Sequence, residues 1–369
     1  MVIRFLARTY PEPSKTDSTV LPSISIILAV HNEERVLDAC IKSLTSLDYP
    51  TDHIEILIGS DGSTDSTNEM LGQYQLQYPF IKPFFFEQQR GKMPVLNDLV
   101  TSATNEILFF ADADITFSTN ALRAHVAHFA DSSTGAVSGG YEIQSSKADT
   151  LYTSEQQYAS IEQQVRINEA QYHSTMGLFG GNYTIRKELW QLLPDGLVHD
   201  DLYVVFSVLD QGYRVLFEPA ARSFDNFTRT YREEFRRKSR SASRGYHTLS
   251  YFPKLLLPRG GRTALLLWSH KILRWLSPFI ILIILISLAI GDIESAGLIY
   301  TLFLGSFVGV SILAIIGFIT ESLGLHVPIV RQLSWFIVMN IAYLHGTMVY
   351  LTSSDTDIWK RASRAAKTA

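Results

Sequence analysis

Two aspartates stand one residue apart directly after an apolar run, where they could bind a metal ion. The run, Ile107–Ala111, is continuously apolar and contains two phenylalanines, which predicts a short buried strand. Ligands of open α/β sheets bind outside the carboxyl ends of the strands, and Asp112 and Asp114 follow such an end. Carboxylate oxygens there would suit Mg²⁺ or Mn²⁺ holding a diphosphate. The alternative is an acidic turn that caps the next helix.

A second polar segment, His31-Asn32-Glu33-Glu34, follows the first predicted strand. Backbone groups from Ala29 onward and the side chain of Glu33 could line a pocket for a nucleotide base. Asn32 is also a suitable N-cap for the helix expected to follow. Capping alone would explain this segment, so both interpretations stay open at this point.

The next predicted strand ends in Gly59-Ser60-Asp61-Gly62, and a lysine lies further along. Small residues let a ligand approach the backbone, and Asp61 could accept a hydrogen bond from a base N–H or a ribose hydroxyl. A simple Gly/Asp/Ser turn is the alternative. Gly91-Lys92 precedes a helix expected to start near Pro94, and Lys92 could contact a phosphate as a point charge.

Two further clusters carry charges that could take part in a reaction. His199-Asp200-Asp201 opens a predicted helix, where the carboxylates either cap the helix or include a general base. Such a base would take the proton from an attacking hydroxyl. Arg240 and Arg244 are four residues apart and share a predicted helix face. Their guanidinium groups suit a leaving diphosphate, and we assign this pair to it. Anionic lipid binding is the competing role, which we assign to the outer basic residues of the segment.

Short apolar runs alternate with amphipathic helical segments between Ser23 and Glu218. The runs are Ile24–Val30, Ile54–Gly59, Phe84–Phe86, Ile107–Ala111, Ala136–Tyr141 and Tyr213–Phe217. The helical segments include Glu33–Leu47, Asp65–Tyr78 and Tyr152–Tyr172. Strands that alternate with helices in this way predict an α/β fold with a mainly parallel, twisted sheet.

The second half of the chain is membrane-like. Three apolar segments predict three spanning helices: Trp275–Ile290, Gly297–Ile319 and Leu333–Leu351. Before them, Arg222–Arg274 holds thirteen Lys or Arg against three Asp or Glu. A basic block in this place suits an anionic membrane surface.

The charges flanking the first span predict its orientation. The basic block before it and the acidic residues Asp292 and Glu294 after it place the first domain in the cytoplasm by the positive-inside rule. Three spans would then put the tail outside, although its cations favour the inside (Lys360, Arg361, Arg364 and Lys367). One segment could therefore be interfacial or re-entrant, and Leu333–Leu351 is the weakest span because it contains Asn340 and His345.

Composition and length set the remaining limits. The net charge of −4 over 369 residues gives no reason to expect nucleic acid as a partner, and we predict none. Cys40 is the only cysteine, which excludes an intrachain disulfide, and its apolar helical setting predicts inert core. Met1–Lys15 lacks the apolar core of a signal peptide, so no cleaved segment is expected. The predicted domains are an extension (1–21), an α/β domain (22–220), a basic juxtamembrane region (221–274), a membrane region (275–352) and a basic tail (353–369).

From Pro22 to Gly245, these segments, in this order, resemble the family 2 glycosyltransferases, inverting enzymes with a GT-A fold that use nucleotide-sugars. By that resemblance, Asp61 contacts the nucleoside, although Ser60 stands where the family has another aspartate. Asp112-Ala113-Asp114 matches the Asp-x-Asp motif of the family, with Asp114 as the expected direct metal ligand.

The resemblance also assigns roles further along the chain. Gly181 and Asn182 match the small-residue loop near donor sugar and acceptor. Asp201 matches the catalytic base, and Asp200 replaces the glutamate usual beside it. The processive members carry Gln-x-x-Arg-Trp near the membrane, and the corresponding residues here, Arg240 to Gly245, lack it, which argues against processivity.

The resemblance implies metal-dependent transfer of a sugar, with a UDP-sugar as the default donor, to a lipid-linked or other membrane-associated saccharide. Cell-surface polysaccharide synthesis at the cytoplasmic face of the plasma membrane is the expected setting. A sugar nucleotidyltransferase is one alternative, but it would need a glycine-rich, basic loop after the first strand, which this sequence lacks. A catalytically inactive membrane scaffold is the other. The departures at Ser60 and Asp200 allow it, whereas retention of Asp112, Asp114 and Asp201 argues against it.

Overall fold

The computed structural model describes residues 2–13, 15, 21–144, 150–197, 199–226, 231–290, 297–322 and 327–352. These residues form two compact units. The first contains the described residues up to 226 together with 248–267, and the second contains 231–247 and 268–352. Asp292, Glu294 and the basic tail lie outside the described residues.

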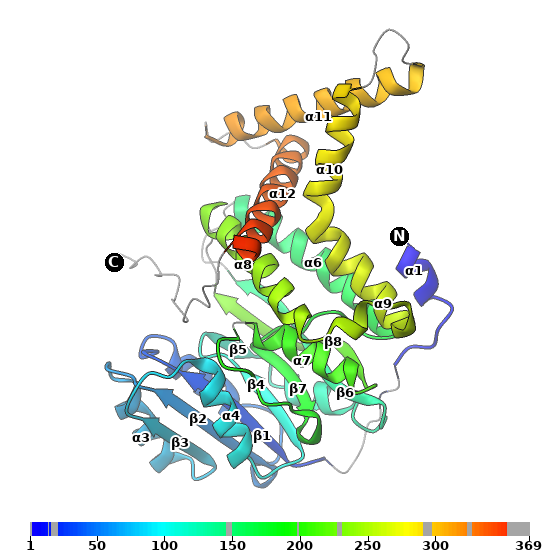
Figure 1. The fold of residues 1–369 in the computed structure, drawn as a ribbon. Coiled ribbons are helices and arrows are strands. Elements are labelled where there is room, and N and C mark those ends of the chain that lie inside the picture. The colour runs from blue at the N-terminus through cyan, green and yellow to red at the C-terminus, as the bar shows by residue number, and fades with distance from the viewer. Residues whose placement is uncertain are drawn as a thin grey trace. The chain divides into compact units, whose positions relative to one another are not determined.

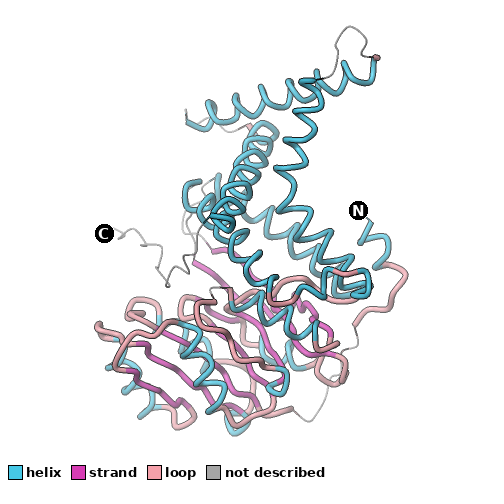
Figure 2. The backbone as a smooth tube through the Cα atoms, in the orientation of Figure 1, coloured by secondary structure: helices cyan, strands magenta, loops and turns pink. Residues whose placement is uncertain are grey.

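One mixed sheet of eight strands forms the centre of the described part of the first unit (Figures 1 and 2). The strands are β1 (Ile24–Val30), β2 (Ile54–Asp61), β3 (Ile81–Phe86), β4 (Ile107–Ala111), β5 (Ile115–Phe117), β6 (Thr134–Gln144), β7 (Asn182–Arg186) and β8 (Arg214–Asn226). Their order is β3-β2-β1-β4-β7-β6-β8-β5. The first four run parallel, β7 is antiparallel to both of its neighbours, β6 pairs with β8 in parallel, and β5 is antiparallel to β8. The predicted α/β fold with a mainly parallel sheet is confirmed.

Helices cover both faces of this sheet. The helices of the first unit are α1 (Val2–Ala7), α2 (Leu37–Thr45), α3 (Thr67–Gln77), α4 (Lys92–Ser102), α5 (Ala121–Val126), α6 (Thr150–Tyr172), α7 (Asp200–Asp210) and α9 (Gly261–Leu267). Every residue of β1 and β4 is buried, which explains why their sequences are continuously apolar instead of alternating. Leu37 and Ile41 of α2 belong to the core on one face.

Helix α4 packs very close to the opposite face of the sheet. A Cβ added to Gly59 of β2 would overlap the side chain of Val95 and lie 3.3 Å from Leu99, so only glycine fits there. Ala29 of β1 pairs with Gly59 in the sheet. Two small residues side by side therefore let α4 approach the strand ends.

Two strands and one helix start differ from expectation. The strands β5 and β7 were not predicted, because β5 has three residues and β7 alternates polar and apolar side chains that are nearly all buried. Of the two interpretations of Asn32, the structure does not show the helix cap. Helix α2 begins at Leu37 without a side-chain cap, and Asn32, at φ 54°, accepts hydrogen bonds from the backbone N–H groups of Thr64 and Asp65.

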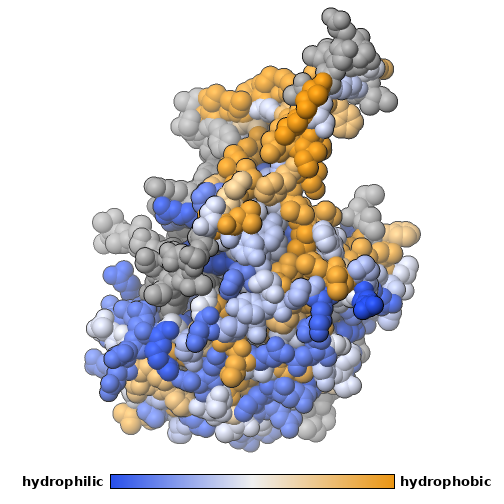
Figure 3. All heavy atoms as spheres, viewed as in Figure 1, coloured by the Kyte–Doolittle hydropathy of each residue, from blue (hydrophilic) through white to orange (hydrophobic). Residues whose placement is uncertain are grey.

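The second unit is helical. Helix α8 (Tyr231–Ser250) begins in it, and α10 (Leu273–Ile290), α11 (Leu298–Ser322) and α12 (Pro328–Thr352) follow. Two segments among the described residues are long and apolar enough to cross a membrane, Pro258–Leu288 and Tyr300–Gly317, where three spans were expected. Hydrophobic residues gather on the visible face of α10 and α11 (Figure 3).

Helix α12, which contains the third predicted span, carries polar contacts instead. The hydroxyl of Ser277 on α10 donates a hydrogen bond to Asn340 Oδ1 on α12 over 2.6 Å. His345 Nδ1 lies 2.7 Å from the hydroxyl of Ser239 on α8. These polar partners explain why α12 is less apolar than the other two segments.

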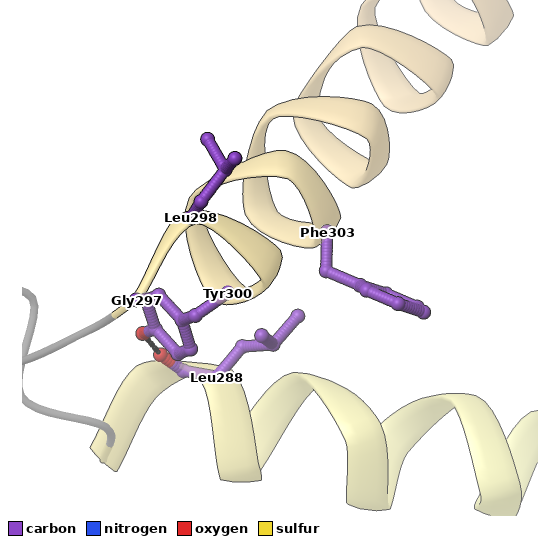
Figure 4. A pocket seen from close by; sticks show the side chains of 5 residues that line it. All are labelled: Leu288, Gly297, Leu298, Tyr300 and Phe303. Atoms are coloured by element: carbon purple, nitrogen blue, oxygen red, sulfur yellow. Dashed lines mark hydrogen bonds between the residues drawn. The ribbon is translucent and has the colours of Figure 1, made fainter.

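An apolar hollow lies in the second unit between the end of α10 and the start of α11 (Figure 4). It is lined by Leu288, Gly297, Leu298, Tyr300 and Phe303. Its one polar side-chain group, the Tyr300 hydroxyl, donates a hydrogen bond to the carbonyl of Leu288. None of these five lining residues carries a charge.

Candidate active site

The polar segments predicted from the sequence meet at one edge of the sheet. Strands β2, β1 and β4 are adjacent and parallel, with Val30 paired to Ser60 and Leu28 paired to Ala111. The segments after β1, β2 and β4 therefore leave the sheet on the same side (Figure 1). This is the edge where open α/β sheets bind ligands.

Lys92 links two of the predicted carboxylates. Its Nζ lies 3.0 Å from Asp112 Oδ1 and 2.9 Å from Asp200 Oδ2. Lys92 is the first residue of α4, Asp112 follows β4, and Asp200 is the first residue of α7. Burial disfavours the charge on Lys92, but the two carboxylates outweigh this and raise its pKa above the ordinary value. Burial likewise opposes ionisation of Asp200, and Lys92 nevertheless lowers the pKa of that carboxyl.

Asp61 fixes the turn that presents this lysine. Its Oδ1 accepts the backbone N–H of Arg90 and its Oδ2 accepts that of Gly91, both over 2.8 Å, and the residue is 1 % exposed. Gly91 has a φ of 95°, a conformation that favours glycine. The carboxylate predicted to contact a nucleoside thus holds the start of α4, a role that sequence reasoning missed.

The segment after β1 is tied to the same loop. His31 Nδ1 donates a hydrogen bond to the carbonyl of Asp61 over 2.6 Å. Glu33 is buried, and its backbone N–H donates to Thr67 Oγ1 over 2.8 Å. Ala29 lies inside β1 and is buried, so what it can offer a ligand is backbone.

Gly180 and Gly181 lie close to the predicted base and to the predicted metal motif. A Cβ on Gly181 would lie 3.2 Å from both Cβ and Oδ2 of Asp112, and a Cβ on Gly180 would lie 3.6 Å from Cβ of Asp201. The glycine pair therefore contacts Asp112 on one side and Asp201 on the other. A side chain on either glycine would therefore come against one of these two carboxylates.

One carboxylate oxygen of Asp201 accepts a hydrogen bond, and the other faces Gly180. Its Oδ1 accepts the backbone N–H of Leu202 over 2.8 Å and lies 3.4 Å from His199 Nε2. Its Oδ2 would lie 3.7 Å from a Cβ on Gly180. The Asp201 side chain is 24 % exposed, against 12 % for Asp200, which pairs with Lys92. Of the two aspartates, Asp201 is the one accessible to an incoming hydroxyl.

The side chain of Asn182 lies beneath the site, not in it. It is fully buried, donates to the carbonyls of Gly140 and Ala221 over 3.1 and 2.8 Å, and its Oδ1 accepts from His125 Nε2 over 2.9 Å. These bonds hold β7 against β6 and β8. The side chain of Asn182 therefore points into the sheet, whereas Gly181 beside it borders Asp112, and the predicted place of both residues near the sugars stays a prediction.

A stack of aromatic rings under the carboxylates was missed. Phe110 stacks on Tyr183 at 4.6 Å and on Trp190 at 4.9 Å between ring centroids. The Tyr183 hydroxyl is buried and has no hydrogen-bond partner among the described residues. Burial, together with the charges of Asp200, Asp201 and Asp112, raises the pKa of that hydroxyl. A predicted strand at Asn182–Arg186 would have placed Tyr183 beneath the carboxylates. The mixture of polar and apolar residues in this segment gave no strand prediction.

The remaining predicted residues divide between the units. Asp114 lies in the turn between β4 and β5 and is partly exposed. Among the described residues, no group of three His, Cys, Asp or Glu side chains stands ready to hold a metal ion. Arg240 and Arg244 both lie on α8 within the second unit, and their predicted roles stay predictions.

Residues 25–193 match the model of a family described as "Glycosyl transferase family 2". A probable glycosyltransferase, YdaM, from Bacillus subtilis is 26 % identical over 60 % of this chain and 55 % of its own length. A beta-monoglucosyldiacylglycerol synthase from Nostoc is 28 % identical over 65 % and 53 %. The chain thus spans about half the length of these relatives.

A solved structure shares the fold over nearly the whole chain. It is a mannosyltransferase from Pyrobaculum calidifontis in complex with GDP-Man and Mn²⁺. The TM-score is 0.70, the sequences are 18 % identical, and the likeness covers 96 % of this chain and 95 % of that one. At this identity the likeness establishes the GT-A fold of the chain.

Proposed function

Because residues 25–193 match the model of glycosyl transferase family 2, we propose that this chain transfers a sugar from a nucleotide-sugar to an acceptor hydroxyl with inversion at the anomeric carbon. The observation that carries the proposal is the pair of glycines between Asp112 and Asp201. This short glycine segment lies against a carboxylate that suits the donor diphosphate at one residue and against a carboxylate that suits the attacking hydroxyl at the next.

The donor end fits a divalent cation held together with a diphosphate. Asp112 and Asp114 offer hard oxygen ligands on one turn, and Mg²⁺ usually takes one or two carboxylates plus phosphate oxygens and water. The lack of a three-residue ligand cluster among the described residues agrees with a cation that shares its ligands with the nucleotide. When bound, Mg²⁺ or Mn²⁺ would supply Lewis-acid stabilisation of the diphosphate.

The residues of the chain supply the rest of the reaction. Asp201 takes the proton of the acceptor hydroxyl through its Oδ2, the side that faces Gly180. The hydroxyl oxygen forms the new bond to the anomeric carbon as the bond from that carbon to the diphosphate oxygen breaks. Lys92 stands where its positive charge can meet the departing diphosphate, and Asp61 holds the turn that presents it.

We propose a membrane lipid or a lipid-linked saccharide as the acceptor. The Nostoc relative is named a synthase of a glycolipid, and two segments of this chain are apolar enough to span a bilayer. An acceptor confined to the membrane would meet an enzyme held beside it. We place the active site on the cytoplasmic side, where the basic residues before the first apolar segment are expected. UDP-sugars remain the default donors.

The test is a screen of UDP- and GDP-sugars with the full chain in native membranes, with and without Mn²⁺ or Mg²⁺, followed by mass analysis of the lipid fraction. We expect one donor to give a metal-dependent glycosylated product. Asp201→Asn should bind the nucleotide as the unmodified protein does and lose at least a thousandfold in turnover. Full activity of this variant would remove Asp201 from the mechanism.

Two other outcomes correspond to the alternative functions. Release of pyrophosphate from a nucleoside triphosphate and a sugar phosphate would favour a nucleotidyltransferase. Binding of nucleotide without transfer or hydrolysis of any donor would favour the inactive scaffold.

A further inference from the structure

Lys92 is the side chain that joins the donor side of the site to the helix that carries the proposed base. Its ammonium lies within 3.0 Å of a carboxylate oxygen on each side, Asp112 and Asp200. The Lys92 side chain is 18 % exposed, and its backbone is fixed by the Gly91 turn. The contact therefore lies within the folded site and not on an outer surface.

The carboxylates around Lys92 need a cation. Asp112 and Asp114 are one residue apart, and Asp200 shares the Lys92 ammonium with Asp112 at 2.9 and 3.0 Å. Partly buried like charges repel each other strongly unless a cation lies between them. Lysine suits a cation that must move, because its compact charge sits on a flexible stem with three rotatable donors.

We propose that Lys92 is a built-in counter-ion that competes with the divalent metal for Asp112 until a nucleotide arrives. In the donor-free protein it neutralises Asp112 and Asp200 together. When metal and nucleotide bind, its ammonium gives up Asp112 for the diphosphate and keeps its contact with Asp200. The inference rests on the proposed function, since it concerns the same donor site.

The consequence is that metal and nucleotide bind cooperatively. Without nucleotide, a divalent cation must displace the ammonium from Asp112, which weakens its binding. With a diphosphate present, the displaced ammonium gains a new anionic partner, so the cost of displacement is offset. By linkage, the metal must strengthen nucleotide binding by the same factor.

The experiment measures Mn²⁺ binding to the full chain in lipid nanodiscs from the electron paramagnetic resonance signal of free Mn²⁺. Each variant is titrated alone, with UDP and with GDP. For the unmodified protein we expect weak binding of Mn²⁺ alone and at least tenfold tighter binding with one of the two nucleotides. For Lys92→Met we expect Mn²⁺ alone to bind at least tenfold tighter than to the unmodified protein, with a smaller effect of nucleotide.

Three further variants separate this effect from a general loss of structure. Lys92→Arg keeps the cation and should bind Mn²⁺ alone as weakly as the unmodified protein. Asp200→Asn leaves the ammonium to Asp112 alone and should weaken Mn²⁺ binding, the opposite direction. Lys82→Met is the matched control, because Lys82 pairs with the buried carboxylate of Glu55 at 2.7 Å near the start of β2, the end of the strand opposite Asp61.

The inference is overturned if Lys92→Met binds Mn²⁺ alone no more tightly than the unmodified protein, or if Asp200→Asn binds it more tightly. Should Lys92→Met fail to fold, Asp200→Asn still decides the matter. Sugar transfer with unchanged Mn²⁺ binding in these variants would leave the proposed function standing and remove the counter-ion. If the variants bind Mn²⁺ as predicted but the protein transfers sugar from no donor, the counter-ion role stands and the proposed function fails.

Discussion

The carboxylate of Asp61 and the backbone N–H of Gly91, thirty residues apart in the chain, form a hydrogen bond of 2.8 Å that fixes the turn before Lys92. The other carboxylate oxygen accepts the N–H of Arg90 at the same distance. Two parallel acceptors on one planar group define both the position and the direction of this turn. Asp61 therefore positions Lys92 through the backbone and can do so without contacting the substrate.

Asp61→Asn should weaken both the fold and the presentation of Lys92. The amide keeps one acceptor and turns an N–H₂ group toward a backbone N–H, which leaves a buried donor unpaired and costs about 1–3 kcal/mol of unfolding free energy. Thermal unfolding in detergent micelles measures this. Asp98→Asn is the control, because Asp98 pairs with Arg90 at the surface and its loss should change the unfolding temperature far less. Equal effects of the two changes would contradict the prediction.

The two glycines should respond differently to alanine. In Gly181→Ala the new methyl group would lie 2.9 Å from Ile115 and 3.2 Å from Asp112, so it must displace the metal motif, and we expect nucleotide-dependent Mn²⁺ binding to fall at least tenfold. In Gly180→Ala the nearest atom, on Asp201, is 3.6 Å away.

Gly180→Ala should therefore keep nucleotide binding and lose turnover, because its methyl group fills space beside the proposed base. Gly72→Ala, with no atom within 4 Å of the added group, controls for both. Loss of nucleotide binding in Gly180→Ala would show that the two glycines serve the same side of the site.

The protein should lose stability as the pH falls below about 6.5. Burial lowers the pKa of His125 to about 4, from 6.5 in an unfolded chain, and its neutral ring bridges Asn182 and Thr184. Between these values the unfolded chain takes up a proton that the folded protein refuses. The full stability is present above pH 6.5 and is lost as the pH approaches 4, by about 3 kcal/mol for this residue.

Chemical unfolding at pH 7.0, 5.5 and 4.5 measures this loss. Burial and the charges of Arg214 and Arg262 likewise lower the pKa of His173 to about 4, so both histidines act in the same window. The pKa of Glu218 is about 2, and its contribution is lost only below about pH 4.5. His125→Gln should reduce the slope of stability against pH, and an unchanged slope would exclude His125 as its source.

Tyr183→Phe should stabilise the protein. The change removes a buried hydroxyl that has no partner in the described part of the chain and keeps the ring that stacks on Phe110, so the unfolding free energy should rise by about 1 kcal/mol. Tyr183→Ala, which removes the ring as well, should lower it by about 3–5 kcal/mol. A fall in stability for Tyr183→Phe would mean that the hydroxyl has a stabilising partner.

The strands that were predicted best from the sequence are those made of continuous apolar runs. β1 and β4 have the predicted bounds, because strands buried on both faces leave an uninterrupted signal. β7 was missed because Asn182 and Thr184 are polar yet buried. Both side chains form hydrogen bonds with His125, which lies far away in the chain. No local pattern can show such a pairing.

The site follows the same division. Asp112 and Asp201 could be found from their positions beside predicted elements. The contact of Lys92 with Asp200 could not, because it depends on where α7 begins relative to α4. The role of Asp61 was hidden for another reason. A carboxylate that binds backbone looks, in sequence, the same as one that binds a ligand.

The interleaving of the two units has a consequence for biosynthesis. The first unit is complete only when residues 248–267 have left the ribosome, since Phe252 packs on Tyr203 of α7 and Thr263 contacts His173. The apolar segment Pro258–Leu288 begins before that unit ends. Folding of the proposed catalytic unit and delivery of the first hydrophobic segment to the insertion machinery must therefore overlap in time. A fragment cut before residue 231 would lack part of its own core.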